Sequence, residues 1–149
     1  MAPFIALASS FLLFRVIGLL GWSYFDNWHS SLQAAVAVML LLTASAHWGK
    51  RRSDLIRMFP PSFPKKEWIV TVTGWLEVAG AIGILLPFFS LAAAMCLTVL
   101  LIAMFPANIY AARAKLTIGG KPVPKLFVRI WLQIIFITAI ILSSPLFAQ

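Results

Sequence analysis

The sequence has little negative charge and almost no cysteine. Its 149 residues contain 4 acidic residues against 12 lysines and arginines, and hydrophobic residues make up 62% of the chain. Only 11% of the residues are charged, whereas a soluble domain has about 25%. An ordinary soluble domain is therefore excluded. The single cysteine, Cys96, rules out a disulfide within the chain and argues against a thiol–disulfide oxidoreductase that uses its own cysteines.

The positive charge is concentrated in two short segments. Every lysine and arginine except Arg15 lies in residues 49–66, in residues 113–126 or, as Arg129, just after them. A basic loop between apolar segments indicates membrane topology and a surface for anionic lipid, so we expect the lipid bilayer as the partner and no nucleic acid. The two histidines, His29 and His47, lack the clustered ligand spacing of a metal site, so no metal is predicted.

Five apolar segments each approach the roughly 20 residues that a membrane-spanning helix needs. They are residues 3–24, 31–48, 67–86, 91–112 and 127–146. The pattern predicts an all-α fold: a polytopic transmembrane helical bundle of five helices in one domain, residues 1–149. The first segment has no basic region before it and no small-residue cleavage site after it, so it is interpreted as a retained span and not a signal peptide.

The charge pattern predicts the orientation of these spans. With five spans, the basic loops 49–66 and 113–126 share one side, and the positive-inside rule places that side in the cytoplasm. The N-terminus is then cytoplasmic and the C-terminus outside. A four-span arrangement, with residues 3–24 lying on the membrane surface, gives the same loop positions and stays open.

The third apolar segment, Trp68–Pro87, carries one carboxylate, Glu77, near its middle. Gly74, Gly80 and Gly83 recur along the same side of the predicted helix, which favours close packing against a neighbouring helix. An isolated charge at the bilayer centre costs about 2.5–3.5 kcal/mol on insertion scales. Glu77 therefore needs a partner, a proton or a polar pocket.

Other polar residues are expected at membrane depth. Counting along the spans places Arg15 near the midplane and the remaining polar groups in the cytoplasmic half, while the outer half is nearly bare. Two alternatives stay open for Glu77. It forms a buried pair with Arg15 that fixes the register of the helices, or it is protonated or binds a ligand in a polar pocket. The candidate ligand-binding or polar-core residues are Arg15, His47, Trp75, Glu77, Asn108 and Gln133.

Between residues 46 and 142 the sequence resembles the DoxX family of small membrane proteins. The matching features are Ala46-His47-Trp48, MFPPSFP at Met58–Pro64, TGWLEVAGAIGILLP at Thr73–Pro87, and FPANIY at Phe105–Tyr110. The resemblance implies an antiparallel helical bundle in the bacterial plasma membrane, with a four-helix core to which residues 3–24 add an N-terminal span. It also implies quinone as a candidate cofactor, because some members are described as quinone-linked oxidoreductase components.

Three functions are compatible with the residues. No complete catalytic constellation is present, which favours a non-catalytic partner, an accessory or assembly subunit, that contacts another membrane protein or a second copy of the chain. The alternative is a quinone-linked oxidoreductase component that binds an apolar ligand near Glu77. A small carrier that titrates Glu77 ranks below both, because no inverted repeat is visible. Whether the chain is an enzyme stays open, and by itself we expect that it is not.

Overall fold

The computed structural model describes residues 1–148, and these residues are almost entirely helical. The six α-helices within this part of the chain are α1 (Ala2–Leu19), α2 (Trp28–Ser45), α3 (Arg52–Arg57), α4 (Lys66–Leu85), α5 (Ser90–Arg113) and α6 (Leu126–Leu142). Short 3-10 helices follow α1 and α6, at η1 (Ser23–Phe25) and η2 (Pro145–Phe147). A two-stranded hairpin, β1 (Thr117–Ile118) and β2 (Lys121–Pro122), connects α5 to α6.

Four of the helices, α1, α2, α4 and α5, are long and apolar enough to cross a membrane. The fifth apolar helix, α6, has 17 residues. It ends at Leu142, before the Ser143-Ser144-Pro145 sequence, so it is shorter than the predicted segment 127–146. The first helix also ends earlier than predicted, at Leu19, because the chain turns at Gly21 with a φ of +113°, a conformation that favours glycine.

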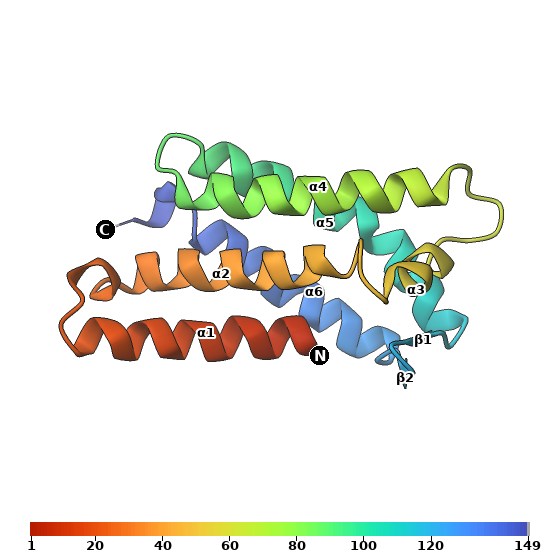
Figure 1. Cartoon of the computed structure of the whole chain (residues 1–149), viewed down its shortest axis with the longest axis horizontal. Coiled ribbons are helices and arrows are strands. Elements are labelled where there is room, and N and C mark those ends of the chain that lie inside the picture. The colour runs from red at the N-terminus through yellow and green to blue at the C-terminus, as the bar shows by residue number, and fades with distance from the viewer. Residues whose placement is uncertain (149) are drawn as a thin grey trace.

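Helix α2 lies between α1 and α4, and α5 and α6 lie behind them (Figure 1). Helix α6 crosses obliquely and contacts both α5 and α2. The short helix α3 and the hairpin lie together at one end of the bundle, and the C-terminus lies at the other end (Figure 1). This arrangement leaves α1 packed against α2 on one side only.

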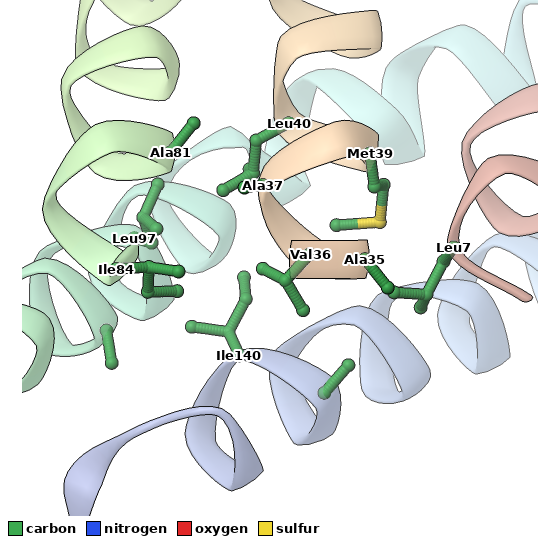
Figure 2. Packing of buried hydrophobic residues seen from close by; sticks show 12 residues of the cluster. Leu7, Ala35, Val36, Ala37, Met39, Leu40, Ala81, Ile84, Leu97 and Ile140 are labelled. Atoms are coloured by element: carbon green, nitrogen blue, oxygen red, sulfur yellow. The ribbon is translucent and has the colours of Figure 1, made fainter. Parts of the chain in front are cut away.

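The core is formed mainly by α2, with one or two buried side chains from each of α1, α4, α5 and α6. Val36 is fully buried and lies near Ile84 of α4 and Ile140 of α6 (Figure 2). Small residues let the helices approach closely: a Cβ atom at Gly80 would lie 2.4 Å from Leu97 Cδ2. The predicted packing role of the glycine side of α4 is therefore confirmed.

The two basic loops are folded against each other. Asp54 in α3 accepts a hydrogen bond from the Gly119 N–H at 2.8 Å, and it pairs with Arg57. Gly119 and Gly120 have φ values of +60° and +76°, as a tight two-residue hairpin turn requires. The two short strands beside this turn lie in the predicted loop 113–126 and were not themselves predicted.

Candidate functional site

The structure brings Glu77 together with His47, one of the six residues predicted to lie in a polar site. His47 lies in the turn that follows α2, and Glu77 lies in the middle of α4. The His47 Nε2 and Glu77 Oε1 atoms are 3.5 Å apart, and the two side chains are only 4% and 12% exposed. Gly74, one turn before Glu77, faces His47 and makes room for the imidazole. These residues form the candidate site.

The hydrogen bonds of His47 determine how many protons the pair holds. Its Nδ1 lies 2.6 Å from the Val70 carbonyl oxygen. A carbonyl only accepts hydrogen bonds, so Nδ1 carries a proton and donates it. If the imidazole is neutral, Nε2 presents a lone pair to Glu77, and the carboxyl must then be protonated to bond to it. If Nε2 is protonated, the contact is an ion pair, so the histidine and the carboxylate share a single proton in either state.

One oxygen of Glu77 and the rings of two tryptophans take no part in the contact between His47 and Glu77. Glu77 Oε2 is buried without a hydrogen-bond partner among the described residues. The rings of Trp48 and Trp75 meet edge to face with centroids 5.1 Å apart, and they are 43% and 61% exposed. Trp75, one of the candidate ligand-binding residues, therefore lies on the outside of the bundle. Its position next to Gly74 on the helix turns it about 100° away from His47 and onto the outer surface.

Arg52 supports the site from the loop side, a role that charge counting did not reveal. Its guanidinium donates to the His47 carbonyl at 2.8 Å, and to the Glu67 carbonyl at 3.1 Å and the Thr71 hydroxyl at 2.9 Å. It thereby joins the end of α2 to the start of α4. A guanidinium has five donors in a fixed plane and can make such a bridge, but its position in a basic loop gave no signal for this.

Arg15 does not pair with Glu77, so that interpretation is wrong. Its guanidinium donates to the backbone carbonyls of Asp26 at 2.6 Å and Phe25 at 3.2 Å. Because α1 ends at Leu19, Arg15 lies one turn from the end of the helix and not at its middle. There it satisfies the carbonyls of η1, at the end of α2 opposite His47.

Asn108 and Gln133 join α5 to α6. Asn108 Oδ1 accepts a hydrogen bond from Arg129, and Gln133 Nε2 donates to the Leu101 carbonyl at 2.6 Å. Pro106 lies inside α5 between these contacts and has no N–H to donate. The polar residues that were predicted to lie in the cytoplasmic half of the bundle thus form separate contacts between pairs of helices.

A second polar cluster lies at the other end of the bundle, where the sequence predicted almost none. His29 Nε2 lies 2.8 Å from the Ser144 carbonyl. Gln33 Nε2 donates to the Ser143 carbonyl at 2.9 Å and to the Ser90 hydroxyl at 3.2 Å. The signal that was available is the Ser143-Ser144-Pro145 sequence, which ends a helix and leaves free carbonyls. These contacts hold the end of α6 against α2 and α5.

Within residues 1–148, no group of three or more histidine, cysteine, aspartate or glutamate side chains is placed to hold a metal ion. Comparison with protein families matches residues 36–143 to a model described as a domain of unknown function, DUF8561. That range contains His47, Glu77 and Arg52, and it leaves out α1. No curated protein and no solved structure matches the chain.

Proposed function

We propose that this chain, which belongs to the DUF8561 family, is a five-span protein of the bacterial plasma membrane with a DoxX-like core, and that it acts as a non-catalytic partner or accessory subunit. Four helices have the length and apolarity for spanning. Helix α6 is roughly 25 Å long at 1.5 Å per residue, and η2 extends the apolar segment beyond it. The basic loops at the α3 end favour that end as the cytoplasmic one.

The observation that carries this proposal is how the deep polar groups are used. Each one connects helices of the chain itself: His47 bonds to Val70 and faces Glu77, Asn108 bonds to Arg129, and Gln133 bonds to a carbonyl of α5. Such contacts stabilise one arrangement of helices. They favour a rigid scaffold over a site that turns over a substrate.

Helix α1 offers the surface for a partner. It packs along α2, and its opposite face exposes Ile5, Leu12, Leu13 and Val16 by 51–64%. Ser9 lies on the same exposed face, and a small residue there allows another helix to approach closely. We propose that this face binds a transmembrane helix of another membrane protein.

Site-specific photo-crosslinking in native membranes tests the partner role. A photoreactive amino acid at Leu12, 64% exposed on α1, is compared with one at Val99, 66% exposed on α5. We expect one discrete adduct from position 12 that is absent from position 99 and is lost when Ser9→Phe fills the face. The same mixture of abundant membrane proteins at both positions would contradict the proposal.

A quinone-type ligand at His47 and Glu77 is the second candidate. The observations that favour it are the unpartnered Glu77 Oε2 and the exposed ring of Trp48, whose centroid lies 6.3 Å from that of the His47 ring and which also meets the ring of Trp75. When bound, a quinone supplies two-electron chemistry. The protein residues fit its ring in two respects: when Glu77 Oε2 carries the proton of the pair it can donate to a carbonyl oxygen, and the indoles provide an aromatic surface open to the membrane.

Tryptophan fluorescence tests this candidate without an activity assay. We expect a soluble quinone analogue to quench the emission of the wild type in a saturable way, and Glu77→Leu, which removes every donor at this position, to weaken binding by at least about tenfold, the effect of losing a buried hydrogen bond. Trp131→Phe, which removes an exposed ring on α6, serves as the control. Linear, unsaturable quenching in the wild type would exclude the site.

A further inference from the structure

The start of α4 carries a hollow that combines two lysines with apolar side chains. The hollow has a volume of about 790 Å³, and its lining consists of Ile56, Phe63, Lys65, Lys66, Glu67 and Trp68. Phe63 and Trp68 are 47% and 71% exposed, so both present apolar surface beside the lysines. Phe63 is held in place by the buried Phe59, with ring centroids 5.7 Å apart.

We propose that this hollow binds one anionic glycerophospholipid, with its phosphate at Lys65 and Lys66 and an acyl chain along Phe63 and Trp68. The inference rests on the membrane placement proposed above. That placement puts the first residues of α4 at the depth of the lipid headgroups, where lysine and tryptophan side chains anchor spans.

Charge and apolarity together select this occupant. The two lysines and the Glu67 carboxylate give the lining a net charge of +1, which complements the single negative charge of a phosphodiester. A zwitterionic lipid brings an additional cation that the lysines repel. Free phosphate leaves the surfaces of Ile56, Phe63 and Trp68 uncovered, whereas an acyl chain removes them from the aqueous boundary.

The backbone at Lys65 fixes how the lysines are presented. Lys65 has a φ of +50° and a ψ of +40°, a left-handed conformation that is uncommon for a residue with a side chain. It follows Pro64, and α4 begins at the next residue, Lys66. Lys65 precedes the helix in this left-handed conformation, and Lys66 is the first helical residue. The side chains of both lysines line the same hollow.

Native mass spectrometry after reconstitution tests the site. The chain is placed in nanodiscs of equimolar phosphatidylglycerol and phosphatidylcholine, and the lipids that remain bound on release are counted. We expect one retained phosphatidylglycerol in the wild type. In Lys65→Asn/Lys66→Gln we expect retention to fall by about fivefold for each lysine and about 25-fold for both. Asparagine suits position 65 because it tolerates the left-handed backbone.

Two further variants separate a site from general attraction. Lys121→Gln/Lys125→Gln removes the same charge from the hairpin region, and we expect it to keep the bound lipid. Phe63→Ala leaves the charge unchanged, and we expect it to weaken retention. An equal loss in both lysine pairs, or unchanged retention in Lys65→Asn/Lys66→Gln, would overturn the proposal.

Resistance to alkaline extraction, measured on the same samples, distinguishes the two proposals. A chain that stays in the membrane without preferring phosphatidylglycerol overturns the lipid site and leaves the membrane topology intact. A chain that alkali releases from the membrane overturns both.

Discussion

Gly74 and His47 are in direct contact across α4 and the end of α2. A Cβ atom at Gly74 would lie 2.7 Å from His47 Cβ and 2.9 Å from His47 Cγ. Since both contacted atoms are close to the backbone, the imidazole has no room to yield by a change of rotamer. The glycine thus fixes the position of the histidine that faces Glu77.

Gly74→Ala is expected to destabilise the bundle by about 1–3 kcal/mol, the usual cost of overpacking a tight contact. Steric trapping or unfolding in mixed micelles measures the change in free energy. Ala79→Val, an addition of carbon on the exposed side of the same helix, provides the control and should leave stability nearly unchanged. Wild-type stability in Gly74→Ala would mean that α2 and α4 are farther apart than described.

A double-mutant cycle on His47→Gln and Glu77→Gln should show an interaction between the two residues. Removing one partner leaves the other buried and uncompensated, so the effects of the single substitutions should differ from additivity by about 0.5–3 kcal/mol. Unfolding free energies of the two single variants and the double variant supply the measurement. The matched cycle on Arg15→Gln and Glu77→Gln should be additive, because Arg15 bonds to the η1 carbonyls; coupling there would restore the Arg15–Glu77 pair.

Acid should loosen the contact between α3 and the hairpin. The hydrogen bond from the Gly119 N–H, and then the Arg57 guanidinium, hold the pKa of the Asp54 carboxyl below its usual value. A lowered pKa in the folded state means that the contribution to stability is complete above about pH 4, the value in an unfolded chain, and is lost as the pH falls through the folded pKa.

Hydrogen exchange at the Gly119 amide, corrected for the intrinsic rate at each pH, measures this contribution. Protection should be present at neutral pH and decline below about pH 4, while Asp54→Asn should lower protection at neutral pH and remove its pH dependence. A pH dependence that survives in Asp54→Asn would assign the effect to another group.

Gln33→Leu should release the end of α6. The substitution leaves the Ser143 carbonyl and the Ser90 hydroxyl without their donor, at a cost of about 0.6–2 kcal/mol for a hydrogen bond between membrane helices. Hydrogen exchange should rise over residues 143–147. Gln133→Leu removes a comparable bond from the other half of α6, so it should leave residues 143–147 protected; equal exchange in both variants would refute the local effect.

Part of the site followed from the spacing of residues on α4. Val70, Gly74 and Glu77 recur at three- and four-residue intervals and therefore share one helix face, and the structure turns that face toward His47. The same geometry turns Trp75 outward. That face does not reveal which neighbour meets it, so a pair with Arg15 was one of the predicted alternatives for the carboxylate, whereas its contact in the structure is His47.

The sequence by itself determined that the chain is helical and apolar enough for a membrane, where its long helices lie, and which carboxylate lies near the middle of one of them. Hydropathy, charge placement and helical periodicity are local properties that each segment carries alone. Only the tertiary structure decided that Glu77 faces His47, that Arg15 bonds to η1 and that Gln33 holds the end of α6. A polar group in an apolar bundle bonds to the nearest available atom. Which atom is nearest depends on where helices end and where they cross, and no single segment encodes this.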